Sequence, residues 1–557
     1  MISFSAPVRS PSRKGRSARP SVDVEQAPRE SVAGPSGGLG GPAVELDQAP
    51  GGSAAEGDRA PGRFDEGPGR HARTALVVWA GIILVGFAVG AVLRSTGHLP
   101  VDRLPPLHAA PRLLLGPLLP AAVVALVAVA VLPVAARRLP WGAVLVVAWL
   151  GSALWAAVLQ LPDGLARPLT APTEYLAGLP VVGDDPLRWL RGFTRDMQAY
   201  PTHVKGHPPL PTLILWGLRH AGLRDAGWAA ALVIVVGGSA SAAIAVTVRR
   251  LAGAETARRA VPFLVLAPTA LWVATSVDAL FLGVAAWAVA FVTVAATRPA
   301  VPPAAGSAAP PAARAAGAPI AGAAGPLATR PPGSPVVRSV VQSAAGRAAG
   351  QDGRGLAVAF AGGVLLGSLP YLSYGLLPLF ALPLAVLVLT RPPRPVLAAL
   401  AVGCVVVPVA CTVAGFSWFA GVAGTHAAWA AGGGARARPY AYFLLGDLSV
   451  LALLVGPATA VALPAVLGRA VALARSMVRR AGPVDDGRLG WPVAAALIGM
   501  VALDLSGVTR GEVERIWIPY AAWTTVACAV HRPPARTLLL AQAVTALLIQ
   551  ALVRSPW

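Results

Sequence analysis

Two histidines and one of the chain's two lysines lie within five positions of one another, directly before an apolar segment. They are His203, Lys205 and His207, in the stretch "YPTHVKGHPPLP". Cationic groups beside a helix N-terminus favour anions, because the first amide hydrogens of a helix have no partner within it. The spacing of the histidines also matches two metal ligands on one helix face, but Gly206 and Pro208 disfavour a helix there. We therefore expect phosphate contacts and assign no metal ligand, with a divalent metal as the alternative.

A second group of charged residues lies near the carboxyl end, in "LDLSGVTRGEVERIW" between two apolar runs. Ionisable groups at membrane depth are costly and usually mark a substrate path or an internal ion pair. A purely structural Glu–Arg pair is the alternative interpretation. Two isolated acids, Asp278 and Asp447, are expected toward the same face. The charged members of the group are Asp504, Arg510, Glu512, Glu514 and Arg515.

The long polar interval 161–209 supplies acids that could act as a general base. Asp163 and Glu174 come first, and Asp184, Asp185 and Asp196 follow. The segment "DDPLRWLRGFTRDM" predicts an amphipathic helix at the membrane surface, since its apolar residues recur at helical spacing. An aspartate would cap that helix, with Pro186 in its first turn. A solvated loop without chemical function is the alternative.

The amino-acid composition indicates whether the rest of the chain lies in water or in lipid. Hydrophobic residues make up 55% of the 557 residues and charged residues only 13%. A soluble globular protein has about a quarter of its residues charged, so the sequence predicts an all-α, multi-pass membrane protein. The net charge of +21 does not indicate nucleic acid binding, because the arginines are scattered at the ends of apolar runs. The three cysteines lie inside such runs, which leaves no disulfide framework or zinc spacing.

Apolar length predicts the membrane spans, because a hydrocarbon core of about 30 Å needs about 20 helical residues. The Pro-, Gly- and Ser-rich residues 1–73 should form a disordered cytoplasmic tail, and 298–354 a disordered Ala/Pro-rich cytoplasmic linker. These intervals leave two membrane regions, 74–297 with its outer loop 161–209, and 355–557. The expected spans are 74–93, 113–135, 141–160, 226–248, 260–275, 279–297, 355–369, 375–390, 395–415, 441–467, 491–505, 516–531 and 537–553.

Arginine-rich loops prefer the cytoplasm, which orients these spans. The rule places 161–209, 276–278, 370–374, 416–440 and 506–515 on the extracytoplasmic face and the N-terminus in the cytoplasm. Residues 210–222 would cover only about 20 Å, too short to cross unaided. We therefore expect a re-entrant or partly inserted helix there and about 13 crossings in all.

Six stretches together resemble a group of actinobacterial integral membrane proteins similar to the GT-C glycosyltransferases, the superfamily of protein O-mannosyltransferases and aminoarabinose transferases. The resemblance covers about residues 141–531 without the linker. It departs from the better-known enzymes in lacking an acidic pair at the start of the first outer loop and a large outer C-terminal domain. The stretches are "RPLTAPTEYLAGLP", "YPTHVKGHPPLP", "WVATSVDALF", "YLSYGLLPL", "RPYAYFLLGDLSVLAL" and "GEVERIWIPY".

The resemblance implies a polyprenyl-phosphate-linked sugar as donor and a cell-envelope acceptor. Glu174 would take the place of the first-loop acid, with Asp163 as the competing choice. The donor phosphate would lie among His203, Lys205, His207, Arg510 and Arg515, with Asp278 nearby and Glu512 or Glu514 orienting the sugar. A transporter or flippase of lipids or small molecules is the alternative from another class, although the chain lacks the internal repeat typical of transporters.

Overall fold

The structure, a computed structural model, describes residues 68–100, 102–297, 335–431, 438–479, 487–533 and 535–556. Helices account for most of these residues, as the sequence predicts, and the two short strands contain two residues each. Strand β1 (Ala110–Pro111) pairs antiparallel with β2 (Val553–Arg554) and joins the loop after the first helix to the carboxyl end.

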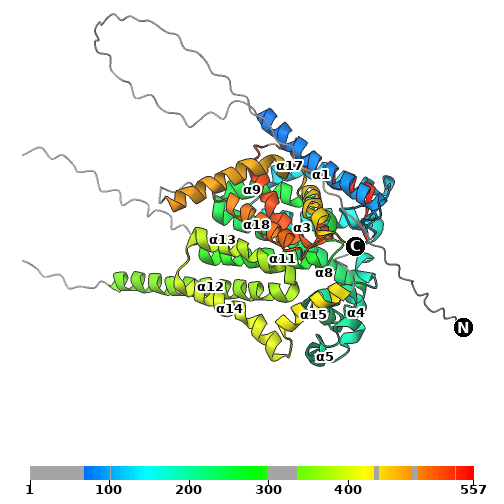
Figure 1. The fold of residues 1–557 in the computed structure, drawn as a ribbon. Coiled ribbons are helices and arrows are strands. Elements are labelled where there is room, and N and C mark those ends of the chain that lie inside the picture. The colour runs from blue at the N-terminus through cyan, green and yellow to red at the C-terminus, as the bar shows by residue number, and fades with distance from the viewer. Residues whose placement is uncertain are drawn as a thin grey trace, which may run out of the picture. The chain divides into compact units, whose positions relative to one another are not determined.

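Eight helices within the described ranges are long and apolar enough to cross a membrane, which indicates a multi-pass membrane protein (Figure 1). Four shorter apolar helical segments accompany them. The eight are α1 (Pro68–Ser95), α2 (Leu119–Arg138), α3 (Trp141–Gln160), α8 (Ala226–Ala252), α11 (Asp278–Ala296), α12 (Pro335–Leu372), α14 (Arg394–Val413) and α17 (Tyr440–Val478). The shorter segments are η5 (Tyr374–Phe380) with α13 (Ala381–Thr390), α18 (Gly490–Ser506), α20 (Ile518–Thr524) with η7 (Thr525–Val530), and α21 (Arg536–Leu552).

The remaining elements are short and connect these helices. Between α3 and α8 lie η2 (Leu161–Asp163), η3 (Pro168–Thr170), α4 (Tyr175–Val182), α5 (Pro186–Gly192), η4 (Met197–Ala199), α6 (Thr202–Gly206) and α7 (Leu210–His220). The others are η1 (Gly116–Leu118), α9 (Ala254–Val265), α10 (Ala270–Val273), α15 (Trp418–Ala431) and α19 (Val513–Ile516).

Helix α11 forms the centre of the bundle and packs against α8, α12, α13 and α20. Small residues permit the close approach of its neighbours, as is usual between membrane helices. A Cβ atom on Gly283 would collide with the backbone of Val236 in α8. A Cβ atom on Gly238 would lie 2.9 Å from the amide nitrogen of Ala153 in α3. The core therefore depends on glycine at these contacts.

Helix α17 is broken in its middle, which apolar length did not predict. Gly456 has a φ of 72°, and Pro457 follows it. Gln542 of α21 bonds to the interrupted backbone: its Nε2 donates to the Val455 carbonyl at 2.9 Å, and its Oε1 accepts from the Ala458 amide at 3.2 Å. Non-helical backbone at membrane depth is tolerated where protein groups satisfy it in this way.

Other boundaries also differ from those expected. The predicted span 260–275 is divided, since α9 ends at Val265 and α10 begins at Ala270. Helix α12 begins at Pro335 and includes 335–354 of the interval expected to be a linker, a stretch rich in the good helix former alanine. Helix α1 begins at Pro68, inside the expected tail. Residues 1–67 and 298–334 lie outside the described residues, so their disorder stays a prediction.

Helices α5 and α7 agree closely with the sequence interpretation. Asp185 caps α5 by accepting a hydrogen bond from the Arg188 amide at 2.9 Å, and Pro186 is the first helical residue. The helix ends at Gly192 rather than continuing to Met197. Helix α7 contains 11 residues and is about 16 Å long, too short to cross a bilayer as a single helix.

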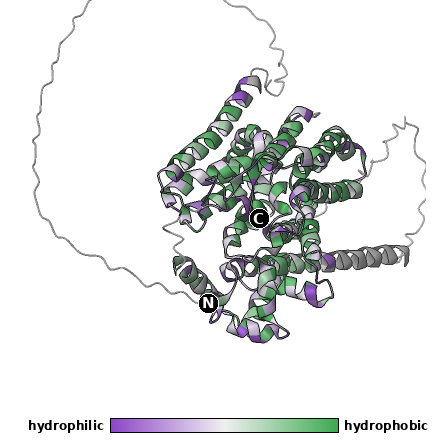
Figure 2. Cartoon of the chain, turned by 90° about the vertical axis from the view of Figure 1, so that its right-hand side faces the viewer, coloured by the Kyte–Doolittle hydropathy of each residue, from purple (hydrophilic) through white to green (hydrophobic). Residues whose placement is uncertain are grey.

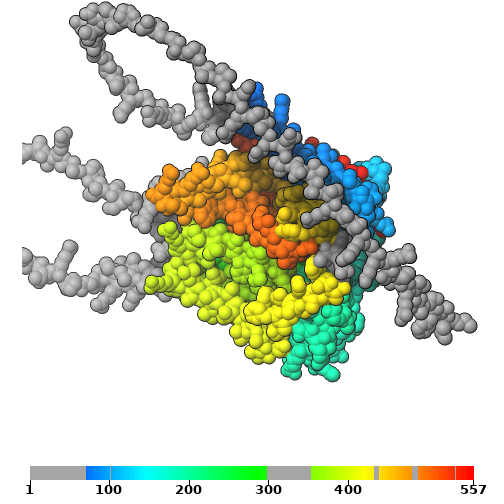
Figure 3. Space-filling view, in the orientation of Figure 1, coloured from blue at the N-terminus to red at the C-terminus, as the bar shows by residue number. Residues whose placement is uncertain are grey.

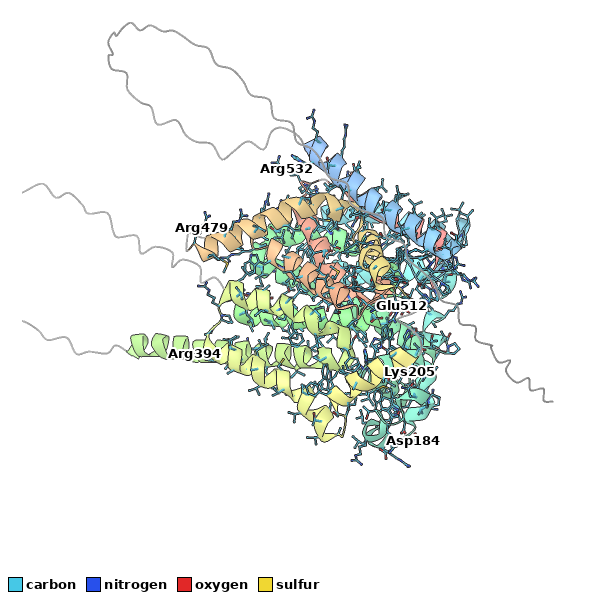
Figure 4. All side chains as sticks on the ribbon, viewed as in Figure 1. Asp184, Lys205, Arg394, Arg479, Glu512 and Arg532 are labelled. Carbon is cyan, nitrogen blue, oxygen red and sulfur yellow. The ribbon has the colours of Figure 1, made fainter. Side chains whose placement is uncertain are left out.

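The two ends of the bundle carry different charged residues. Arg394, Arg479 and Arg532 lie toward one end, and Lys205 and Glu512 toward the other (Figure 4). Hydrophobic residues dominate the helices between them (Figure 2).

Candidate functional site

The loop between α3 and α7 contributes a buried acid and imidazole pair. Glu174 is the residue before α4, and His203 lies in α6. Oε1 of Glu174 is 2.7 Å from Nδ1 of His203, and both side chains are buried. The His203 amide donates to the Thr173 carbonyl at 2.9 Å and so ties α6 to the start of α4. A carboxylate held against an imidazole in this way fixes the orientation of the ring.

His207 lies beside this pair but not on the same helix face. Helix α6 ends at Gly206, and His207 has extended backbone. Its Nδ1 lies 3.0 Å from the His203 carbonyl oxygen, and the two rings are 6.3 Å apart and nearly perpendicular. The i, i+4 ligand geometry is therefore not formed. Within the part of the chain that the structure describes, no three His, Cys, Asp or Glu side chains are grouped so as to hold a metal ion.

Arg515 of α19 forms the second part of the site with two carboxylates from distant segments. Its Nη1 is 2.9 Å from Oδ2 of Asp278, the first residue of α11, and its Nη2 is 2.8 Å from Oε2 of Glu512. Ser276 donates its hydroxyl to the same Asp278 oxygen. Glu512 has a φ of 59°, a left-handed conformation that is unfavourable for a residue with a side chain. Such strain persists only where surrounding contacts enforce it, as the ion pairs of Glu512 do.

The ion pairs continue from Glu512 to the loop that follows α1. Arg438 Nη1 is 2.9 Å from Glu512, and its Nη2 is 3.5 Å from Oδ1 of Asp102. The same Asp102 oxygen lies 2.6 Å from Nδ1 of His108, and the His108 amide donates to Oε1 of Glu514 at 3.2 Å. Four segments of the chain thus share one charged network at one end of the bundle.

The two parts of the site are neighbours. The ring of His207 lies 6.0 Å from the ring of Phe281 in α11 and 5.6 Å from that of Tyr175. Burial lowers the pKa of His207 to about 4, and the charges of Asp278 and Arg515 act on it in opposite directions. His207 is therefore neutral at pH 7 and can accept a hydrogen bond.

The charge states of the network follow from its pairing. Burial raises the pKa of Glu512, but the guanidinium groups of Arg515 and Arg438 outweigh it and hold this pKa well below its ordinary value. Burial lowers the pKa of His108, but the hydrogen bond with Asp102 and the charge of Glu512 raise it overall. Glu512 consequently stays ionised at neutral pH.

Two further acids lie buried beside the network, within the apolar helices. Asp447 of α17 is fully buried and accepts a hydrogen bond from the Gly511 amide at 3.3 Å. Asp504 of α18 is 4% exposed and lies close enough to Asp447 for their charges to interact. Among the described residues, Oδ2 of Asp447 and Oδ1 of Asp504 have no hydrogen-bond partner.

Two of the residues predicted for the site, Asp163 and Arg510, direct their side chains to partners outside both of its parts. Asp163 pairs with Arg112 at 2.7 Å and with Gln550 at 3.0 Å, and so connects η2 to α21. Arg510 lies 5.4 Å from the ring centroids of both Trp429 and Tyr440. The Lys205 carbonyl accepts a hydrogen bond from Thr425 of α15 at 2.9 Å, and the surfaces of α15 and the α4–α6 region meet in Figure 3.

Asp102, His108 and Arg438 belong to the network but were not predicted from the sequence. The first two occur in a short loop between apolar segments, and Arg438 follows a Gly- and Arg-rich stretch. The signal available was an aspartate six residues before a histidine in the loop between the first two expected spans. That signal is weak, because loop charges are usually solvated.

In comparisons with known proteins, no family model, no curated protein and no solved structure matches the chain. The interpretation of the site therefore rests on its geometry and chemistry.

Proposed function

We propose that this protein is an inverting membrane glycosyltransferase that resembles the GT-C superfamily. It would move a sugar from a polyprenyl-phosphate donor to a cell-envelope acceptor on the extracytoplasmic face of the cell membrane. The proposal includes a cytoplasmic N-terminus and about 13 crossings, which are the eight long helices, the four shorter apolar segments and the divided segment α9–α10.

One observation carries the proposal: an early loop and a late segment converge at one end of an apolar bundle. The loop brings Glu174, His203 and His207, and the late segment brings Glu512 and Arg515. Charged side chains at membrane depth are costly and are usually functional. A lipid-linked sugar phosphate needs this combination, with an apolar surface for its tail and charged groups for its head.

The reaction assigns a role to each part of the site. The acceptor hydroxyl oxygen forms a bond to the anomeric carbon of the sugar, and the bond from that carbon to the phosphate oxygen breaks. The hydroxyl proton moves to the Glu174–His203 pair as general base. Polyprenyl phosphate leaves, and cationic groups such as Lys205 and Arg515 stabilise its charge. Asp163 is bound by Arg112 and Gln550, so we assign it a structural role.

Substitution of Glu174 by glutamine tests the assignment. Loss of a general base typically costs about 10²–10⁴-fold in rate, so Glu174→Gln at normal membrane abundance should leave sugar transfer close to the level of the deletion strain. The readout is the profile of lipid-linked sugars, in which an unused donor accumulates. Asp184→Asn is the matched control, because Asp184 is a fully exposed carboxylate of the same loop. Full activity of Glu174→Gln removes Glu174 from the role.

A transporter is the second candidate, favoured by one specific observation. Asp447 and Asp504 are buried acids inside α17 and α18, and buried acids at such positions carry protons in many pumps and transporters. An assay of the purified protein in detergent distinguishes the transferase from the transporter. A transferase consumes lipid-linked donor in detergent, whereas a transporter produces no new compound there and acts only between sealed compartments.

A further inference from the structure

An apolar groove lies between the C-terminal half of α1 and the loop that follows it. Its volume is about 690 Å³, within the range of about 300–1,000 Å³ that is typical of ligand sites. Leu84, Phe87 and Leu104 contribute apolar walls, and Arg94 and Arg103 lie among the lining residues. Among the described residues that line the groove there is no acid. The groove is thus mainly apolar, and the charged side chains that line it are both cationic.

The length of the groove matches one leaflet of a bilayer. Leu84 and Arg94 are separated by about 15 Å along α1, half of the hydrocarbon thickness of about 30 Å. Arg94 lies in the last turn of α1, and its guanidinium donates to the Asp102 carbonyl. The cationic end of the groove is therefore fixed beside the charged network that contains Asp102 and His108.

We propose that this groove binds one anionic membrane lipid, whose phosphate headgroup carries a net negative charge. The acyl chain of the lipid lies along the face of α1 that carries Leu84 and Phe87. The phosphate of its headgroup contacts Arg94 and Arg103. Charge complementarity carries the choice of occupant, because a lipid without net charge would leave two arginines unmatched at this position. The inference does not depend on sugar transfer.

The headgroup contact is tested with two lipids that have the same acyl chains. Full-length protein in detergent is mixed with phosphatidylglycerol or with phosphatidylcholine, and the bound lipid is counted by native mass spectrometry. The wild type should retain several-fold more phosphatidylglycerol. Arg103→Ala should lower the retention of phosphatidylglycerol to that of phosphatidylcholine. Arg188→Ala, which removes an exposed arginine of α5, should change neither.

A bulky side chain in the groove tests whether the acyl chain of the lipid lies there. Ala88 lines the groove, whereas Val85 is 63% exposed on the same helix and does not line it. Ala88→Trp should reduce retention of both lipids, and Val85→Trp should not. Equal retention of the two lipids by the wild type overturns the proposal, since only bulk lipid would be bound. An Arg103→Ala effect without an Ala88→Trp effect also overturns it, because the lipid would then lie elsewhere.

Discussion

Arg515 holds the site together as the shared partner of two carboxylates. It lies against Asp278 and Glu512, with only 7% of its side chain exposed. Burial opposes its charge, but the two carboxylates outweigh that effect and raise its pKa. Formation of a buried ion pair gives little net stability, because desolvation offsets the attraction. Removal of one member is costly, since the remaining charges stay buried without compensation.

Substitution of Arg515 by methionine should therefore destabilise the protein by about 3–5 kcal/mol. The change keeps an apolar side chain in the space but leaves Asp278 and Glu512 without this guanidinium. Thermal unfolding in detergent measures the effect. Arg188→Met should stay within about 0.5 kcal/mol of the wild type, because Arg188 is exposed. Equal melting temperatures for the two variants would show that the network does not stabilise the fold.

The identity of several site residues could be predicted from sequence, but their pairing could not. Glu512, Arg515 and Asp278 stand out because charged residues are rare in apolar sequence. Asp278 and Arg515 are 237 positions apart, and only the packing of α11 against α19 and α20 brings them together. Glu174 and Asp163 are equivalent as sequence signals, since both are acids in the same loop. Their partners, a histidine for one and an arginine for the other, distinguish them.

At the scale of elements, helices α12 and α14 approach each other through glycines on both sides. A Cβ atom on Gly403 of α14 would collide with the Phe360 carbonyl of α12. A Cβ atom on Gly363 of α12 would collide with the Leu400 carbonyl in return. Close backbone contact of this kind replaces the hydrophobic driving force that membrane helices lack.

A valine at position 403 should force the two helices apart. Overpacking of a tight contact costs about 1–3 kcal/mol, so Gly403→Val should unfold at a lower temperature or denaturant concentration than the wild type. Gly355→Val is the control, because a Cβ atom on Gly355 of α12 meets nothing within 4 Å. A wild-type unfolding midpoint for Gly403→Val would contradict the close contact.

Hydropathy predicts where apolar elements lie but not where they break. The expected span 441–467 corresponds to the first two-thirds of α17, yet its interruption at Gly456 is bonded by Gln542, which is 86 positions away. Helix α15 was missed because Trp418–Ala431 fell within a segment assigned to an outer loop. Length and polarity are local properties, whereas a broken or loop-borne helix is stabilised by partners elsewhere in the fold.

At the scale of the whole molecule, arginines at the ends of helices also bond to and pack against neighbouring helices. Arg258 of α9 donates to the Ala136 and Leu139 carbonyls between α2 and α3, at 2.6 and 2.9 Å. Arg249 of α8 lies 4.6 Å from the ring centroid of Trp141. The positions of the arginines along the chain predict which loops share one end, because the rule needs only the sequence. Which loops contact one another at each end required the structure.

The orientation of everything after α7 depends on whether this helix crosses the membrane. With a length of about 16 Å it should not, so residue 224 should face the same side as residue 188. Arg224→Cys and Arg188→Cys, in a protein whose three native cysteines are replaced by alanine, should both react with a membrane-impermeant maleimide in intact cells. Arg250→Cys, at the other end of α8, should react only after permeabilisation.

Reaction of Arg224→Cys only in permeabilised cells would mean that α7 crosses and that the order of every later loop is inverted. The start of α11, with Asp278, would then lie on the opposite side from His207. The ring of His207 lies 6.0 Å from Phe281, three residues into that helix, so the two sides would have to meet across a distance far smaller than a bilayer. The His207–Phe281 contact and the short length of α7 thus predict the same topology, in which α7 does not cross the membrane. The labelling experiment tests both predictions at once.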